Sequence, residues 1–230
     1  MARPPVRRAL LIDAMGTLIE LRPPAPILRR ELRDRLGIEI SLQQAERGLA
    51  AELAYYRAHM LQGRGPASVA LLHARCAQAL GAALPRAAAA DPTVLTEVLL
   101  ASLRFAAHAD AAPALHAARG RGERVVVVSN WDASLPAALA SAGLAALVDA
   151  VVTSAEVGAA KPDAAIFERA LAVAGVARTA ARHVGDSLAE DIEGARRAQV
   201  AAVWCNRHRD PVPDGVRAIA SLAELDGAWP

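Results

Sequence analysis

The sequence predicts an α/β protein: a Rossmann-like parallel sheet with helices on both faces, plus an inserted α-helical cap domain. Two observations favour this fold. Short valine-rich runs alternate with helical segments in the second half of the chain, and a block of nearly ninety residues before them shows only helical spacing. Continuous apolar runs, in place of alternating ones, are typical of strands covered on both faces, which favours parallel pairing with crossover helices.

The predicted core comprises residues 1–20 and 111–230, and the predicted cap comprises residues 21–110. The core begins with a buried strand, Arg8–Asp13, followed by a turn at Gly16-Thr17. The cap contains no convincing strand. Apolar residues recur there at helical spacing, and Ser41 with Gln44 three positions later indicates a helix start. The predicted cap helices are 27–36, 41–60, 68–80 and 92–107.

The rest of the core alternates strand and helix. The predicted strands are 124–129, 148–153, 182–186 and 200–205, and the predicted helices are 133–142, 162–174 and 191–199. A chain of 230 residues with 54% hydrophobic residues is long enough to bury a substantial core.

Composition argues against several partners. The net charge is +2, the arginines are interspersed with acids, and aromatic residues make up 3% of the chain, so neither a duplex nor a stacked single strand is an expected partner. The longest weakly polar stretch, 135–148, is too short to span a membrane. Cys76 and Cys205 form no metal or disulfide motif. We expect a cytoplasmic protein with a small-molecule substrate and no membrane association, either a monomer or a homodimer.

One lysine stands out among the basic residues. Of 26 lysines and arginines, only Lys161 is a lysine. A lysine carries a compact ammonium on a slim stem, whereas arginine is a wide planar fork. We therefore predict that arginine cannot replace lysine at position 161.

Polar residues follow four segments of the predicted sheet. They are Asp13 after the first strand, Ser129 with Asn130, Lys161, and Asp186 with Asp191. Ligands of open parallel sheets bind beyond the carboxyl ends of the strands. The sequence therefore predicts that these residues converge at one edge of the sheet.

Each of these residues also has a purely structural interpretation. Asp13 suits a helix N-cap, Ser129 a turn, and Lys161 a solvated helix entry with Pro162 at the first helical position. Asp186 and Asp191 suit the first turn of a helix, where acids complement the macrodipole. Their joint placement is what favours a site.

The four segments resemble, in order, the motifs of the haloacid dehalogenase-like hydrolase superfamily. The matching stretches are 13–18 (DAMGTL), 127–130 (VVSN), 160–162 (AKP) and 185–195 (GDSLAEDIEGA). The helical insert between the first and second motifs resembles that superfamily's small cap. The resemblance covers nearly the whole chain, about residues 8–209.

The resemblance implies a catalytic mechanism in which Asp13 is the nucleophile, usually through an aspartyl-phosphate. It implies Mg²⁺ held by an Asp13 oxygen, the Met15 backbone carbonyl and Asp186. Lys161 is implied to neutralise the nucleophile and the phosphoryl oxygens, and Ser129 to hydrogen-bond them.

The resemblance also implies supporting roles. Thr17, Ser129, Asn130 and Lys161 are expected to bind substrate. Asp191 is expected to orient Lys161 or a metal-bound water without binding the metal itself.

Position 15 departs from the phosphatase pattern. Phosphatases of the superfamily carry a second aspartate two residues after the nucleophile, which protonates the leaving alcohol; here it is Met15. Losing such a group costs roughly 10²–10⁴ in rate. Met15 is expected to be a buried apolar residue, and His59 or His73 is a candidate substitute for the missing acid.

Three functions remain open at this point. The 2-haloacid dehalogenase branch also lacks the second aspartate and works without metal, which Met15 favours. Asp186, in its Gly-Asp-Ser context, instead favours the metal-dependent members. We therefore place a Mg²⁺-dependent phosphatase first, a weak or non-catalytic phosphate-binding relative second, and a dehalogenase third.

Overall fold

A computed structural model describes residues 8–225 of the chain. These residues form two compact units. The sheet unit holds residues 8–20, 106–131 and 135–225, and the helical unit holds residues 21–105 together with the short segment 132–134. That the helical unit serves as a substrate-selecting cap remains a prediction.

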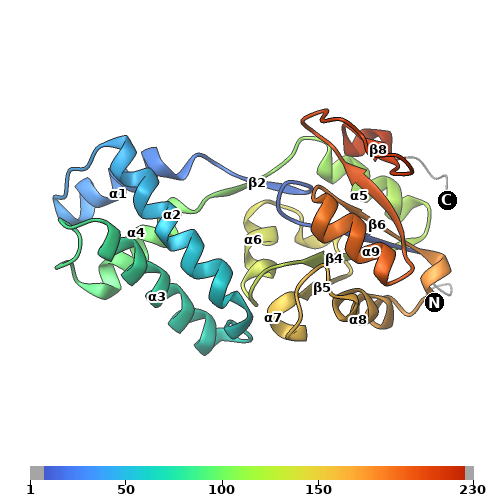
Figure 1. Ribbon diagram of the computed structural model, residues 1–230, viewed down its shortest axis with the longest axis horizontal. Coiled ribbons are helices and arrows are strands. Elements are labelled where there is room, and N and C mark those ends of the chain that lie inside the picture. Colours follow the sequence, from blue (N-terminus) through green and yellow to red (C-terminus); the bar gives the residue numbers. More distant parts are fainter. Residues whose placement is uncertain (1–7, 226–230) are drawn as a thin grey trace. The chain divides into compact units, whose positions relative to one another are not determined.

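The sheet unit is built on six parallel strands (Figure 1). In spatial order these are β5 (Ala150–Thr153), β4 (Glu123–Ser129), β1 (Arg8–Ile12), β6 (Ala181–Gly185), β7 (Ala201–Cys205) and β8 (Ala218–Ile219). The chain runs from β1 to β4 and β5 on one side and then returns to β6 on the other. The strand order therefore reverses at β1, the kind of point where ligands bind in open α/β sheets.

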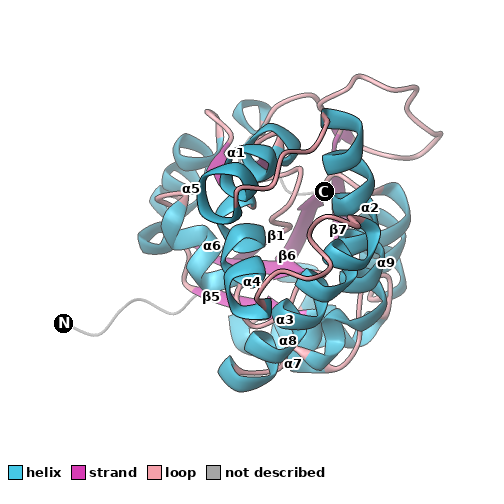
Figure 2. Ribbon diagram, turned by 90° about the vertical axis from the view of Figure 1, so that its left-hand side faces the viewer, coloured by secondary structure: helices cyan, strands magenta, loops and turns pink. Residues whose placement is uncertain are grey.

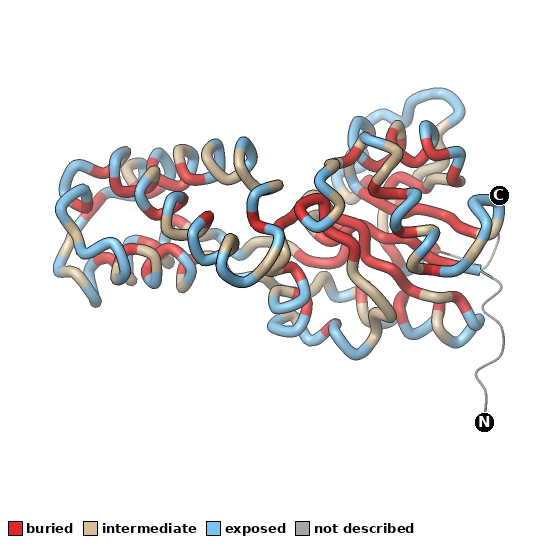
Figure 3. The backbone as a smooth tube through the Cα atoms, turned by 90° about the horizontal axis from the view of Figure 1, so that it is seen from below, coloured by how far each residue is buried: buried red, intermediate tan, exposed pale blue. Residues whose placement is uncertain are grey.

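Both faces of the sheet are covered, as the continuous apolar runs predict. Leu11 and Val126 pack with Phe167 of helix α8 (Ala164–Ala174) and Ala195 of helix α9 (Glu193–Arg197). Successive strand residues point to opposite faces, and Leu10 is also fully buried. Helix α5 (Ala111–Gly120) contacts β4. The strands are buried almost throughout (Figure 3), and the predicted fold class is confirmed.

Short elements complete the sheet unit, of which Figure 2 labels α6 and α7. They are helices α6 (Leu135–Ser141) and α7 (Ser154–Val157), the π-helical turn η4 (Leu188–Ile192), and the 3₁₀ turns η2 (Ala145–Leu147), η3 (Arg178–Ala180) and η5 (Leu222–Glu224). The turn η4 directly precedes α9. The predicted single helix 191–199 therefore begins three residues earlier, at Leu188, and changes its winding at Glu193.

The helical unit contains four α-helices packed around their own apolar core. They are α1 (Pro24–Leu36), α2 (Leu42–His59), α3 (Pro66–Ala83) and α4 (Pro92–Ser102), with the 3₁₀ turn η1 (Met60–Gln62) between α2 and α3. Leu28, Leu32, Leu80 and Val98 are fully buried in this core. Ser41 and Gln44 form the expected capping box at the start of α2.

Three predictions about elements are wrong. The helix predicted over 92–107 ends at Ser102, because the chain becomes extended and forms strand β3 (Phe105–Ala107), which pairs with β2 (Ile19–Leu21). The stretch predicted to have no strand therefore contains one. Pro162 is not the first helical residue either, since Asp163 caps α8 through Ala165 N at 2.9 Å.

Some elements gave no clear signal in the sequence. Helix α5 lies in an alanine-rich stretch without a clear apolar period, and β8 has only two residues. Among residues 8–225, no helix combines the length and the apolar character that crossing a bilayer requires.

Candidate active site

Polar residues gather at the carboxyl edge of the sheet unit. Asp13 directly follows β1, Ser129 is the last residue of β4, and Asp186 directly follows β6. The Asp13 backbone N–H donates to the Val184 carbonyl at 2.9 Å and so extends the pairing of β1 with β6 by one residue. The segment between α7 and α8 brings Lys161 to the same edge.

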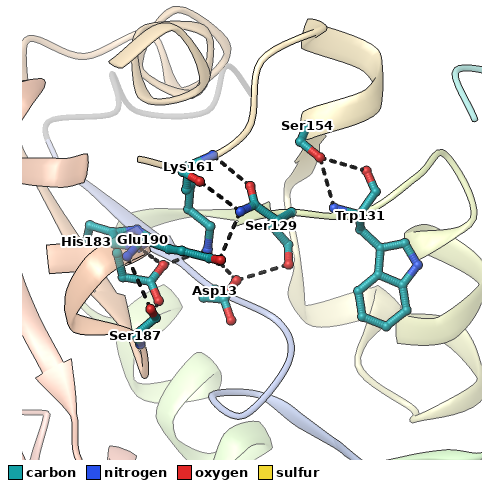
Figure 4. A network of polar contacts seen from close by, with 10 residues as sticks. Asp13, Ser129, Trp131, Ser154, Lys161, His183, Ser187 and Glu190 are labelled. Atoms are coloured by element: carbon teal, nitrogen blue, oxygen red, sulfur yellow. Dashed lines mark hydrogen bonds and ion pairs between the residues drawn. The ribbon is translucent and has the colours of Figure 1, made fainter. Parts of the chain in front are cut away.

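Asp13 lies at the centre of a network of polar contacts (Figure 4). Its Oδ1 accepts hydrogen bonds from Ser129 Oγ at 3.0 Å and from Lys161 Nζ at 2.5 Å. Its Oδ2 has no hydrogen-bond partner within the described part of the chain. The residue is 4% exposed. One oxygen of the carboxylate is therefore fixed by the protein, and the other is free for a cation or a reacting atom.

Lys161 joins two carboxylates. Its Nζ lies 2.5 Å from Asp13 Oδ1 and 2.6 Å from Asp191 Oδ1, and the side chain is 1% exposed. Burial by itself would lower the pKa of Lys161, but the charges of Asp13 and Asp191 raise it, so the ammonium stays charged. A compact ammonium suits this narrow gap, which is the physical reason for a lysine in a chain otherwise rich in arginine.

Asp191 is fully committed to other protein groups. Besides Lys161, its Oδ1 contacts His183 Nε2 at 2.8 Å, and its Oδ2 accepts from the Ser187 N–H at 3.0 Å. Burial would raise the pKa of Asp191, but Lys161 and His183 lower it. Position 185 must be glycine, because a β-carbon there would collide with the Asp191 carboxylate. Asp191 therefore acts on Lys161, and both of its oxygens already contact other protein groups.

Asp186 is the carboxylate without a cationic partner. It is exposed, and within residues 8–225 its side chain makes no hydrogen bond to another residue. Trp204 Nε1 donates to its backbone carbonyl at 2.8 Å. Loss of hydration and the charge of Asp191 raise the pKa of Asp186 to about 6. The turn after Asp13 passes so close that a β-carbon at Gly16, where φ is +79°, would collide with the Asp186 carboxylate.

The three acids form one cluster. Carboxylate oxygens of Asp13, Asp186 and Asp191 lie within 4.8 Å of one another. Lys161 supplies one positive charge against three potential negative charges. Burial raises the pKa of Asp13 to about 7, with further contributions from Asp191 and Asp186, whereas Lys161 lowers it. This part of the edge is therefore short of positive charge.

Asn130 holds the backbone of Lys161. Its Oδ1 accepts from the Lys161 N–H at 2.7 Å, and its Nδ2 donates to the Lys161 carbonyl at 3.0 Å and to Glu190 Oε2 at 2.9 Å. Both amide hydrogens are in use. A side-chain contact between Asn130 and substrate stays a prediction, whereas its observed contacts position Lys161.

The remaining predicted residues of the first motif differ in exposure. Thr17 is fully buried, and its Oγ1 has no hydrogen-bond partner among the described residues. Its predicted role in substrate binding stays a prediction. Met15 was expected to be a buried apolar residue, and it is instead partly exposed.

The two candidate histidines make contacts inside the helical unit. His59 stacks on Tyr55, and its Nδ1 lies 2.8 Å from the Tyr55 carbonyl. His73 Nε2 lies 3.5 Å from Asp132 Oδ2. That either one replaces the missing acid stays a prediction.

Sequence reasoning missed three residues that support this site. His183 points from β6 to Asp191, Trp204 holds the backbone of Asp186, and Glu190 contacts Asn130. A histidine and a tryptophan inside apolar strand runs are typical of core residues, and both are indeed buried. No local pattern indicates that their polar atoms face the site.

The fold and this edge define a Rossmann-like α/β protein with a buried, lysine-paired carboxylate at its topological switch point. The family model of the haloacid dehalogenase-like hydrolases matches residues 7–199, and the chain belongs to this family. The predicted family is confirmed.

Individual relatives carry different activities in their names. The phosphoserine phosphatase of Thermus thermophilus is 39% identical over 109 residues, which cover 47% of this chain and 44% of that protein. The matches span about half the length of the first curated relatives, from 44% to 57%.

Solved structures match over nearly the whole chain. A HAD phosphatase from Thermococcus onnurineus has a TM-score of 0.65 and 26% identity over 95% of both chains. A 2-haloacid dehalogenase from Pseudomonas syringae pv. Tomato has a TM-score of 0.68 and 23% identity, over 95% of this chain and 96% of that one. The latter similarity shows the fold alone.

Proposed function

We propose that this hydrolase is a Mg²⁺-dependent phosphatase that acts on a small phosphate monoester through an aspartyl-phosphate on Asp13. One observation carries the proposal: Asp186 and the free oxygen of Asp13 lie together at an edge where Lys161 is already committed to Asp13 and Asp191. A phosphatase named among the curated relatives and another among the solved structures support it.

The residues present fit a magnesium ion. Mg²⁺ prefers oxygen ligands and is usually bound through one or two carboxylates and several waters. Asp13 Oδ2 and the Asp186 carboxylate are uncommitted among the described residues, whereas the Asp191 oxygens are not. Asp13 and Asp186, together with the Met15 carbonyl implied by the family resemblance, would hold the ion. When bound, it would screen the acids and the phosphoryl oxygens from one another.

The protein's own groups account for most of the first step. An Asp13 oxygen forms a bond to phosphorus while the bond from phosphorus to the leaving oxygen breaks. Lys161 and Ser129 hold the nucleophile and are placed to neutralise and hydrogen-bond the phosphoryl oxygens. Water then attacks the phosphorus of the aspartyl-phosphate, which releases inorganic phosphate and restores Asp13.

The first motif contains no residue that can donate a proton to the leaving group. The thioether of Met15 cannot donate one, so the leaving oxygen departs as an anion or takes its proton from water. Esters with acidic leaving groups, such as aryl phosphates, are therefore the preferred substrates. The helical unit is part of this proposal as the cap that selects among them.

Replacing the nucleophile tests the mechanism directly. Asp13→Asn keeps the size of the side chain but removes the attacking carboxylate, and we expect turnover of an aryl phosphate with Mg²⁺ to fall by more than about 10³-fold. The matched control is Asp163→Asn, which keeps an oxygen acceptor for the N-cap of α8 and leaves activity unchanged. Full activity in Asp13→Asn contradicts the mechanism.

Restoring the missing carboxylate tests the departure at position 15. Met15→Asp places a proton donor two residues after the nucleophile, and we expect kcat to rise about 10²-fold on alkyl phosphates and less on aryl phosphates. The ratio of the two kcat values is the measurement. A folded variant with an unchanged ratio means that another group already supplies the proton.

The alternatives separate with two assays. A dehalogenase releases halide from 2-chloropropionate in the presence of EDTA, whereas our proposal expects none, because an ionised Asp186 without a cation repels an anionic haloacid. A binding-only relative is stabilised against heat by vanadate with Mg²⁺ but shows no turnover. Either result would replace the phosphatase assignment.

A further inference from the structure

Arg207, two residues beyond the end of β7, binds the loop that follows the nucleophile. Its Nε donates to the Gly16 carbonyl at 3.1 Å, and its Nη2 donates to the Thr17 carbonyl at 2.7 Å. The guanidinium also forms a two-pronged contact with Asp110, from Nη1 to Oδ2 and from Nη2 to Oδ1, both at 2.9 Å. One side chain thus joins three segments that are distant in the sequence.

Asp110 is itself fixed to a fourth segment. It precedes helix α5, and its Oδ2 accepts from Ser221 Oγ at 2.7 Å and from the Leu222 N–H at 2.9 Å. Burial alone would raise the pKa of Asp110, but hydrogen bonds from Arg207, Ser221 and Leu222 lower it to about 2. The side chains of Arg207 and Asp110 are only 19% and 15% exposed. The pair is therefore charged, shielded and anchored on both sides.

The loop that Arg207 binds is constrained by its own hydrogen bonds and by neighbours on two sides. Its internal bonds run from Leu18 N and Ile19 N to the Ala14 carbonyl and from Gly16 N to the Ile19 carbonyl, while the Gly16 and Thr17 carbonyls turn outward to Arg207. On its other side the loop touches the Asp186 carboxylate at Gly16. A shift of this loop changes the spacing between Asp13, three residues earlier, and Asp186.

We propose that Arg207 is a positioning residue, which with Asp110 fixes the loop 14–19 and thereby the spacing of Asp13 and Asp186. For its effect on catalysis the inference rests on the proposed function, because that spacing sets both the attack on phosphorus and the binding of the cation. Reactions that depend on near-attack geometry lose about 10²-fold for a displacement near 1 Å.

Nearly every basic residue of the chain is an arginine, so an arginine at position 207 is not informative in itself. The inference rests on the geometry of its contacts. The four acceptor oxygens lie around a planar fork that presents five N–H donors in fixed directions. A lysine at the same position concentrates three donors at one point and cannot reach both carbonyls and both carboxylate oxygens together. Arg207→Lys therefore keeps the charge but loses the fixed geometry.

The sheet unit offers a matched control. Arg119 Nη1 contacts Asp149 Oδ1 at 3.3 Å, and Asp149 Oδ2 also accepts a backbone N–H, from Val125 at 2.9 Å. This arginine–aspartate pair lies at the amino ends of β4 and β5, away from the site. Arg119→Lys therefore changes a similar contact without touching the nucleophile loop.

The experiment compares the full-length wild type, Arg207→Lys, Asp110→Asn and Arg119→Lys. We expect both changes at the Arg207–Asp110 pair to lower kcat on an aryl phosphate by about 10- to 100-fold with little change in KM, and to weaken Mg²⁺ binding measured by calorimetry. Hydrogen exchange of amides 14–19 should become at least about 10-fold faster in both variants. Arg119→Lys should change neither kcat nor this exchange.

The outcomes distinguish this inference from the proposed function. If the wild type hydrolyses no phosphate ester, the proposed function fails, and hydrogen exchange at 14–19 still decides whether Arg207 fixes the loop. If the wild type is active and Arg207→Lys keeps both its kcat and its exchange pattern, the positioning role is overturned and the phosphatase stands. A loss of stability equal to that of Arg119→Lys, with kcat and exchange unchanged, assigns Arg207 a merely structural role and likewise overturns it.

Discussion

The two edges of the sheet differ in the balance between buried anions and cations. At the amino edge, Arg182 of β6 faces Glu123 of β4; the two contact at 3.2 Å, and their side chains are 0% and 1% exposed. At the carboxyl edge, Lys161 faces both Asp13 and Asp191, and Asp186 lies beside them. At the amino edge the buried anion Glu123 contacts the buried cation Arg182 and also the partly exposed Arg121, at 2.7 Å, whereas the carboxyl edge holds more anions than cations.

This difference indicates which edge is built for a ligand. A buried carboxylate that already contacts two arginines needs no further cation, although such buried ion pairs add little net stability. At the carboxyl edge, burial raises the pKa values of Asp13 and Asp186, to about 7 and about 6, and the neighbouring carboxylates add to the rise; a cation that arrives there makes the cluster more favourable. The carboxyl edge thus gives up stability in the free protein for the capacity to bind.

Within this comparison of the two edges, the largest expected effect comes from removing the cation at the carboxyl edge. Lys161→Met leaves Asp13 and Asp191 without their shared ammonium, and we expect kcat to fall by about 10²–10³-fold and stability by about 3 kcal/mol. Urea unfolding and aryl phosphate turnover measure the two effects.

Lys161→Arg is the companion variant, because it keeps the charge. The guanidinium is too wide for the gap between the two carboxylates, so we expect at least a 10-fold loss of kcat here as well. Wild-type kcat in the arginine variant contradicts the idea that this gap requires a lysine.

The next effect comes from removing the anion at the amino edge. Glu123→Gln takes from Arg182 its buried counter-charge, and we expect a loss of about 3 kcal/mol in the free energy of unfolding. Turnover per folded molecule should not change, because Glu123 lies at the opposite ends of the strands. The control is Glu193→Gln on α9, whose ion pair with Arg197 is exposed and should contribute less than about 0.5 kcal/mol. Equal effects of the two variants contradict the comparison.

The smallest expected effect is a gain in stability, in place of a loss, and it comes from replacing Asp186. Asp186 has a pKa of about 6 in the folded protein, above its usual 3.8, so the folded state binds more protons than the unfolded state between these values. Without divalent cations, stability therefore falls as pH rises from about 4 to 6. Asp186→Asn removes this loss.

We expect Asp186→Asn to be more stable than the wild type at pH 7 by on the order of 1 kcal/mol, a value reduced because the side chain is exposed, and equally stable below pH 4. Thermal unfolding in EDTA across this pH range is the measurement. The same variant should lose Mg²⁺ binding. A variant less stable than the wild type at pH 7 shows that Asp186 is not under electrostatic strain.

Most of the fold follows from local patterns. The valine runs and the apolar period of the first helices reflect which side chains face a core, and burial at a fixed period is a property of the chain itself. The switch from α4 to β3 could not be predicted in the same way. Its residues, Phe105–Ala107, become a strand because β2 lies beside them, and that neighbour is more than eighty residues away.

For the site as well, the sequence predicts some features and not others. Residue types at strand ends place Asp13, Ser129 and Asp186 at one edge, since parallel strands end together, and the segment between α7 and α8 adds Lys161. The contact partners could not be predicted: Asn130 binds the backbone of Lys161, and Arg207 reaches back to Gly16 and Thr17. Neither contact has a local sequence signature.

The sequence by itself determined the kind of protein this is, its family, and the residues that meet at the carboxyl edge of the sheet. Only the tertiary structure decided how their charges are shared: Lys161 and His183 contact Asp191, whereas the Asp186 side chain forms no ion pair within residues 8–225. The reason is physical. Burial depends on the period along one segment, whereas hydrogen bonds and ion pairs depend on distances between atoms of segments that only folding brings together.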